Sequence, residues 1–120
     1  MAAKTAKTGI YIDAQKLYNV IYAGQFEMDK RDRPLTALRL LDHTERFIAN
    51  FSLAYNTDDK LAYIEKMIAE FEIIKFLCRF AITNGMFKKT YTIGGIKELI
   101  VKMDEGIVKW HKFVKSARQE

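Results

Sequence analysis

The sequence predicts an all-α fold, an up-down-up-down four-helix bundle, on three observations. Four segments repeat apolar residues at alternating steps of three and four, which places those residues on one face of a helix. Short stretches of charged or turn-forming residues separate the segments. One proline and six glycines among 120 residues leave little material for the many turns of a β-sandwich or barrel.

The first two predicted helices are separated by a charged link. The first spans about residues 10–28, and its apolar face repeats from Ile10 to Ile21. The link reads Asp-Lys-Arg-Asp-Arg-Pro, and its proline suits the first turn of a helix because the N–H there has no partner anyway. We expect the second helix over about residues 34–55, with Asp32 as its cap.

The last two predicted helices follow a similar pattern. The third spans about residues 58–84 and ends at Asn84-Gly85, a pair that favours a left-handed stop. The fourth is capped by Thr90 or Thr92, reads to about residue 116 and carries an unbroken heptad seam of apolar positions. Four helices with short links are typical of a bundle in which neighbours run antiparallel.

Length and composition bound the class of protein. A chain of 120 residues suits one domain, so we expect a single bundle over residues 10–118 behind a flexible N-terminus at residues 1–9. With one cysteine and two histidines, the chain can hold neither an internal disulfide nor a four-ligand Cys/His zinc site. No stretch approaches the roughly 20 apolar residues of a membrane span, and the N-terminus lacks an apolar signal core. We therefore expect a cytoplasmic protein without a membrane partner.

The net charge of +5 sits at the two ends of the chain. Residues 1–9 carry two lysines and no acidic residue. Residues 10–85 hold ten basic and eleven acidic side chains, whereas residues 86–120 hold eight basic and four acidic ones. This excess favours a polyanionic partner, although charge alone speaks to association and solubility.

No pattern of catalytic or cofactor-binding residues is present. Cys78 is expected to be buried, because its neighbour Arg79 does not face it on a helix and no base is placed to form a thiolate. His43 and His111 are expected to be solvated surface residues. The glycines of Thr92-Ile93-Gly94-Gly95 match neither the P-loop nor the dinucleotide fingerprint. We expect no enzymatic activity, no metal and no cofactor.

Aromatic residues on the helices are expected to pack rather than to bind. Trp110 lies on the heptad seam and is interpreted as a core anchor. Tyr11, Tyr18 and Tyr22 share one face of the first helix. Tyrosine rows can stack nucleic-acid bases, but packing at a helix interface is the favoured interpretation.

Basic side chains on outward positions are the candidate nucleic-acid contacts. They would meet phosphates without reading bases, and an ordinary solvated face has the same pattern. Three face away from the seam of the last helix, two lie seven residues apart on the second, and two lie in the link between the third and the fourth. The predicted set is Lys102, Lys109, Lys112, Arg39, Arg46, Lys88 and Lys89.

The last helix carries apolar residues on both flanks of its seam. Leu99, Gly106 and Phe113 form one flank, and Val101 and Val108 stand on the other. A simple bundle helix shows one stripe, so Val101 and Val108 predict a contact with another copy of the chain. The alternative is that they are lone exposed apolar residues, which are common.

Three runs resemble one known family. They are Met28-Asp-Lys-Arg-Asp-Arg-Pro-Leu before the second helix, Glu72-Ile-Ile-Lys-Phe-Leu-Cys-Arg-Phe-Ala in the third, and Ile107-Val-Lys-Trp-His-Lys in the last. Together they are similar to the Avd-like superfamily of small four-helix bundles. That superfamily includes the accessory variability determinant of diversity-generating retroelements. It also includes proteins encoded by intervening sequences in bacterial large-subunit ribosomal RNA genes.

The resemblance implies a barrel-like homopentamer with a basic surface that binds RNA or DNA. It also implies an accessory role toward a reverse transcriptase or ribosomal RNA. Arg33, Arg79 and Trp110 match positions of the family pattern, and Trp110 is interpreted as structural. The leading hypothesis is a non-enzymatic basic bundle that self-associates and binds nucleic acid. The alternative is a protein-interaction scaffold without nucleic-acid binding.

Overall fold

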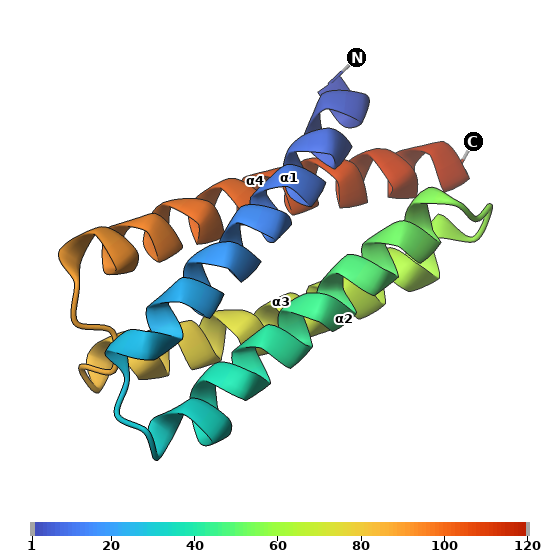
Figure 1. The fold of residues 1–120 in the computed structure, drawn as a ribbon. Helices are drawn as coiled ribbons and strands as arrows, with labels where there is room; N and C mark the ends of the chain where they lie inside the picture. Colours follow the sequence, from blue (N-terminus) through green and yellow to red (C-terminus); the bar gives the residue numbers. More distant parts are fainter. Residues whose placement is uncertain (1, 120) are drawn as a thin grey trace.

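The computed structural model describes the backbone of residues 2–119 and the side chains of residues 9–117. Its long helices are α1 (Ala2–Gly24), α2 (Leu38–Tyr55), α3 (Lys60–Thr83) and α4 (Thr90–Gln119). Two short helical turns, η1 (Gln25–Glu27) and η2 (Arg33–Ala37), lie between α1 and α2. There is no strand in the described residues, and the predicted all-α up-down-up-down bundle is confirmed (Figure 1).

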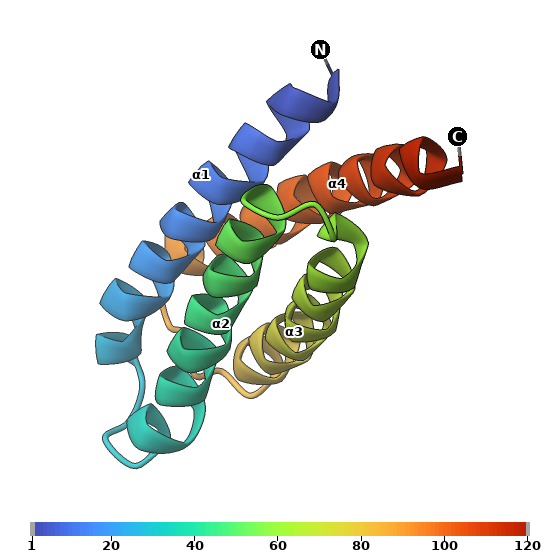
Figure 2. The ribbon, with the colours of Figure 1, turned by 90° about the vertical axis from the view of Figure 1, so that its right-hand side faces the viewer.

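The four helices differ in how extensively they contact one another. α1 packs mainly against α4 and α2 mainly against α3, while the α3–α4 contact is slight and α2 lies diagonally across from α4. Two views show α2 and α3 side by side over most of their length (Figures 1 and 2). The bundle is elongated, at 51 × 22 × 19 Å with a radius of gyration of 14.9 Å. A compact globule of this length would have a radius of about 13.6 Å.

The heptad seam of α4 faces the core, as its periodicity predicts. Met103 and Ile107 are buried there, and Trp110 is only 1% exposed. The Trp110 ring lies 5.4 Å from that of Phe51 on α2, and Phe47 and Phe71 join α2 to α3 with their ring centroids 5.8 Å apart. The interpretation of Trp110 as a core anchor is therefore confirmed.

The boundaries of α1 differ from prediction at both ends. The helix begins at Ala2 rather than near Ile10, because the alanines and lysines of its first residues favour helix even without an apolar face. The flexibility of residues 1–9 stays a prediction. The helix ends at Gly24, after which η1 leads into an extended Met28 with ψ of 152°. A Cβ at Gly24 would lie 3.0 Å from the side chains of Phe87 and Thr92, so glycine allows the α3–α4 link to approach.

The turn after α3 matches its predicted chemistry, whereas the cap before the second helix does not. Gly85 has φ of +67°, and the N–H of Met86 donates to the carbonyl of Ala81 at 2.9 Å, which closes the end of α3. Asp32 makes no side-chain capping hydrogen bond. Its backbone is already helical, with φ of −81° and ψ of −23°, whereas a capping side chain needs an extended backbone to reach the first turn.

Candidate nucleic-acid interface

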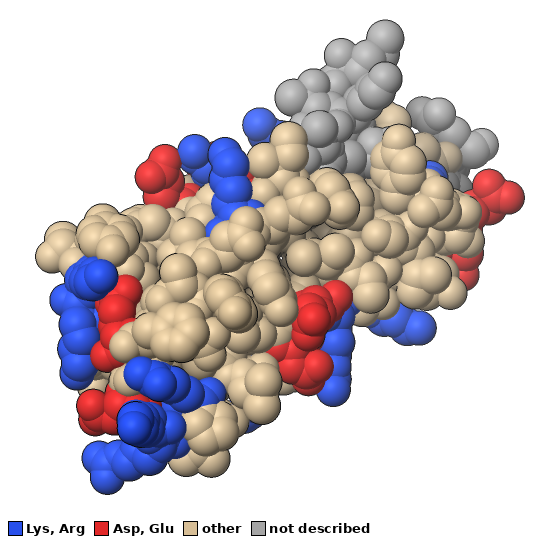
Figure 3. Space-filling model, viewed as in Figure 1, with Lys and Arg blue, Asp and Glu red and all other residues tan. Residues whose placement is uncertain are grey.

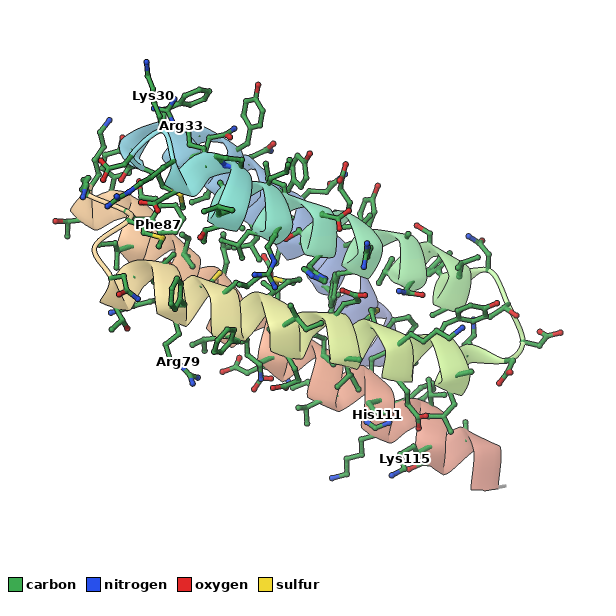
Figure 4. All side chains as sticks on the ribbon, turned by 90° about the horizontal axis from the view of Figure 1, so that it is seen from below. Lys30, Arg33, Arg79, Phe87, His111 and Lys115 are labelled. Carbon is green, nitrogen blue, oxygen red and sulfur yellow. The ribbon has the colours of Figure 1, made fainter. Side chains whose placement is uncertain are left out.

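Residues 25–37 and 85–92 lie together at one end of the bundle, which we call the basic end. Hydrogen bonds to the Glu27 carboxylate join the two segments. The basic end holds five basic side chains against three acidic ones. Figure 3 shows Lys and Arg gathered where α1 connects to α2, and Figure 4 labels Lys30, Arg33 and Phe87 at this same end. The basic members are Lys30, Arg31, Arg33, Lys88 and Lys89, and the acidic ones are Glu27, Asp29 and Asp32.

Glu27 holds the two segments of the basic end together. Its Oε1 accepts hydrogen bonds from the backbone N–H groups of Lys88 and Lys89, each at 2.8 Å. Its Oε2 accepts from the Thr92 hydroxyl at 2.6 Å. Burial by itself would raise the pKa of Glu27, but these hydrogen bonds outweigh burial and hold the pKa below its ordinary value. The carboxylate therefore faces the start of α4, and the charge of Lys89 also helps to lower its pKa.

The Arg33 side chain also has a structural role, because it donates hydrogen bonds to backbone carbonyls. Its Nε donates to the carbonyl of Gln25 at 3.1 Å, and its Nη2 donates to the carbonyl of Phe26 at 3.3 Å. The guanidinium lies 5.4 Å from the centre of the Phe26 ring. Arg33 therefore ties η1 to η2, which assigns a structural role to one of the two arginines that match the family pattern.

The other cations of the basic end are open to solvent, and the pKa of Lys89 is raised mainly by the Tyr91 side chain and less by the charge of Glu27. Lys30, Arg31, Lys88 and Lys89 are exposed, and none of them makes an ion pair in the described part of the chain. The Nζ of Lys88 donates to the carbonyl of Gly85 at 2.7 Å, and the Nζ of Lys89 lies 5.6 Å from the Tyr91 ring centre. These four side chains keep their charge available to an outside anion.

Two of the basic residues predicted on helix faces are neutralised by acidic neighbours. Arg46 pairs with Asp42 at 3.0 Å, and Lys102 pairs with Glu98 at 3.1 Å. The hydrogen bond from Lys102 to Glu98 raises the pKa of Lys102. Both acidic partners stand four residues before the cation, so each pair lies on one face of its helix.

The remaining predicted cations are exposed but divided between helices. Arg39 on α2 and Lys109 and Lys112 on α4 make no ion pair among the described residues. Because α2 and α4 lie diagonally across the bundle, the seven predicted residues do not form one surface in a single molecule. Lys109 and Lys112 share one face of α4, whereas Lys88 and Lys89 lie beside cations of the α1–α2 link.

Val101 and Val108 are both on the surface, 57% and 58% exposed. Val101 lines a groove of about 480 Å³ between α3 and α4, whose lining also includes Arg79 and Lys97. Val108 lines a second hollow of about 300 Å³, together with Lys112. The two valines are placed where another molecule can reach them.

The histidines are not the solvated surface residues that the sequence predicts. Nδ1 of His43 lies 2.6 Å from Oε2 of Glu70, and its side chain is 14% exposed, because α2 and α3 pack together along that flank. His111 is half-buried. Its Nε2 is covered and has no hydrogen-bond partner among the described residues. Both histidines lie at the boundary positions that the sequence allows, but neither is the solvated residue that it favours.

Cys78 and two of the three tyrosines pack as expected. Cys78 is buried, and burial raises the pKa of its thiol to about 12. The Tyr11 ring lies 5.5 Å from that of Phe51, and the Tyr18 hydroxyl donates to Glu45 at 3.5 Å, so both join α1 to α2. Tyr22 instead points to the basic end, where its ring meets Phe26 edge-on at 6.1 Å.

Comparisons with known proteins give no match from which a function could be inferred. No protein-family model, curated protein or solved structure matches this chain. The resemblance to the Avd-like superfamily stays a prediction. None of the helices, within the described residues, is both long enough and apolar enough to cross a membrane. The same residues contain no cluster of three or more His, Cys, Asp or Glu that could hold a metal ion.

Proposed function

We propose that this protein is a non-enzymatic, cytoplasmic helical bundle that self-associates and binds nucleic acid. The observation that carries this proposal is the group of four unpaired cations at the basic end. Lys30 and Arg31 come from one link, and Lys88 and Lys89 from another. Cations of this kind bind phosphates by releasing condensed counterions, and they need no base-specific contact.

Self-association would multiply a modest charge. One copy carries +5, and the proposed pentamer carries that charge fivefold. Lys109 and Lys112 lie about 20 residues, or roughly 30 Å, along α4 from the basic end, so they cannot complete one patch with it in a single molecule. Neighbouring copies repeat every patch, and several weak contacts along one polymer raise avidity without any new contact.

The proposed contact between copies uses Val101 and Val108. Sedimentation at micromolar concentration tests it, since a lone species of 14.0 kDa would rule out self-association. The double change Val101→Lys and Val108→Lys should dissociate the oligomer, because lysine would be buried without a partner. Leu53→Lys, at a residue 49% exposed on α2, is the matched control and should leave the oligomer intact.

A mobility-shift titration tests nucleic-acid binding directly. At low salt, labelled RNA and DNA should both shift with the wild-type protein. The logarithm of the binding constant should fall linearly with the logarithm of the salt concentration. The slope should be about −0.7 per neutralised phosphate on a single strand. Absence of a shift with either polymer at low salt would sink the proposal.

The second candidate is a protein-interaction scaffold that binds no nucleic acid. Several large apolar side chains are exposed to solvent, which favours this candidate. Among them are Leu35, Leu38 and Phe76, which are 65%, 60% and 61% exposed. Apolar surface of this kind often marks a protein contact. A pulled-down partner that survives nuclease treatment, combined with no mobility shift, would favour this candidate.

The family resemblance adds a more specific proposal, that the protein is an accessory of a reverse transcriptase or of ribosomal RNA. A reverse-transcriptase gene beside the coding sequence would support the first role. Co-sedimentation with ribosomal subunits would support the second. Failure of both would leave the general proposal in place, because that proposal rests on the cations of the basic end.

A further inference from the structure

We propose that the basic end selects single-stranded nucleic acid by stacking unpaired bases on Phe26 and Tyr91. This inference rests on the proposed nucleic-acid binding and names the form of polymer that is bound. Phe26 is 62% exposed and Tyr91 is 73% exposed, more than any other aromatic side chain that the structure describes. Both rings lie in the segments that also carry the unpaired cations.

Each ring stands beside a cation. The Arg33 guanidinium lies 5.4 Å from the centre of the Phe26 ring, and the Lys89 Nζ lies 5.6 Å from that of Tyr91. A polynucleotide alternates flat bases with phosphates, so rings interleaved with cations match its chemistry. Proteins that hold single strands combine these two features, a basic track and aromatic platforms.

Glu27 joins the two segments that carry the rings. Phe26 precedes Glu27 in the chain, and Tyr91 precedes Thr92, whose hydroxyl donates to the Glu27 carboxylate at 2.6 Å. The same carboxylate accepts from the backbone N–H groups of Lys88 and Lys89. The two segments are therefore held together before any ligand binds, which lowers the entropy cost of binding.

The positive charge around Phe26 and Tyr91 argues against an apolar protein surface as the ligand that covers these rings. Burying Lys30, Arg31 and Lys89 against such a surface would strip their water without supplying an acidic partner, which is costly. A second copy that docked through the same end would bring the same positive charge. A polyanion with flat bases satisfies the cations and covers the rings at once.

Because stacking on the two rings needs unpaired bases, an intact duplex is not the favoured ligand. In a duplex the flat faces of the bases stack on one another, so only phosphates and groove edges remain for a protein. An unpaired strand can turn its bases onto Phe26 and Tyr91. Stacking one base on an aromatic ring should improve affinity by about tenfold over a strand that lacks bases.

Three probes of equal length test this inference with the full chain, read by fluorescence anisotropy at one salt concentration. They are a labelled oligo(U), an abasic ribose-phosphate strand, and an oligo(U)·oligo(A) duplex, each of about 12 nucleotides. With one base stacked on each of the two rings, wild-type protein should bind oligo(U) about 100-fold more tightly than either of the others. Equal affinity for oligo(U) and the abasic strand, or tighter binding to the duplex, would overturn the stacking.

Ring variants locate the stacking. Tyr91→Ala and Phe26→Leu should each lower the preference for oligo(U) about tenfold, whereas Tyr91→Phe should keep it because the ring remains. Phe76→Ala is the matched control, since Phe76 is 61% exposed on the outer face of α3, away from the basic end. Circular dichroism and the melting temperature confirm that each variant is folded before its binding is compared.

The outcomes separate this inference from the function on which it rests. Binding of all three probes with equal affinity would overturn the stacking and leave nucleic-acid binding intact. Failure to bind any probe at low salt would overturn both. If Tyr91→Ala and Phe26→Leu dissociated the oligomer and left oligo(U) binding unchanged, the rings would serve a contact between copies and the inference would be wrong.

Discussion

The basic end and the outer face of α4 both present exposed lysines, but the two regions differ in how many of those lysines have acidic partners. On α4, Lys102 is paired with Glu98 one helical turn away. At the basic end, Lys88 and Lys89 make no ion pair within the described residues, and the Glu27 carboxylate is bound to their backbone N–H groups. Lys109 and Lys112 on α4 make no ion pair within those residues either, but they lie with Lys102 along a single helix. The basic end instead brings together four unpaired cations from two segments that are far apart in the sequence.

Neutralising the basic end should have the largest effect. The combined change Lys30→Gln, Arg31→Gln, Lys88→Gln and Lys89→Gln should weaken oligo(U) binding about 100-fold at low salt and reduce the salt slope by about 3. Anisotropy titrations over a salt series measure both quantities. Affinity within about threefold of wild type would mean that the basic end is not the contact surface.

Removing the Glu27 carboxylate should cause the largest loss of stability. Glu27→Ala leaves two backbone N–H groups and the Thr92 hydroxyl without their acceptor. We expect a loss of about 2 kcal/mol, or roughly 8 °C in melting temperature. Glu105→Ala, at an exposed position on α4, is the control and should melt close to wild type. Equal melting temperatures for the two variants would contradict the role of Glu27.

The same carboxylate predicts a pH dependence. The folded pKa of Glu27 lies below the unfolded reference of 4.5, so its contribution to stability is present above that pH. The contribution is lost as the pH falls through the folded pKa, because both states are then protonated. Denaturant unfolding of wild type and Glu27→Gln should therefore differ at neutral pH and converge on acidification. A constant difference across that range would refute the assignment.

Arg33 should behave as a structural residue although it is basic. Arg33→Lys keeps the charge but cannot reproduce both hydrogen bonds to the carbonyls of Gln25 and Phe26. We expect a loss of about 1 kcal/mol in the free energy of unfolding and an unchanged salt slope. A smaller salt slope with unchanged stability would place Arg33 among the phosphate contacts instead.

The smallest effect is expected on the outer face of α4. Lys102→Gln combined with Lys109→Gln should weaken oligo(U) binding by less than about threefold, because Lys102 is already paired and only one unpaired cation is removed. The titrations that measure the basic end supply the comparison. A loss as large as that of the basic-end variant would reverse the ranking of the two regions.

The fold could be predicted closely from the sequence because helical periodicity and turn chemistry are local signals. The seam of α4, the burial of Trp110 and the left-handed Gly85 all follow from residues a few positions apart. The basic end could be predicted only in part. The sequence marks Lys88 and Lys89 as candidate contacts, but it presents Lys30 and Arg31 as part of a helix break.

Long-range contacts account for what was missed. Glu27 meets residues 61 and more positions away, and no local pattern marks such a partner. His43 meets Glu70 across the α2–α3 interface for the same reason, so its burial was missed as well. The exposure of Phe26 and Tyr91 depends on where the two links end up relative to the bundle, which periodicity does not reveal.

Photo-cross-linking tests most directly the claim that the basic end contacts nucleic acid. The wild-type protein would be irradiated with 4-thiouridine-substituted oligo(U), digested, and the cross-linked peptides mapped by mass spectrometry. We predict cross-links within residues 25–37 and 85–92, with Phe26 and Tyr91 among the modified positions. Cross-links confined to residues 97–112 of α4, with none at the basic end, would contradict the account.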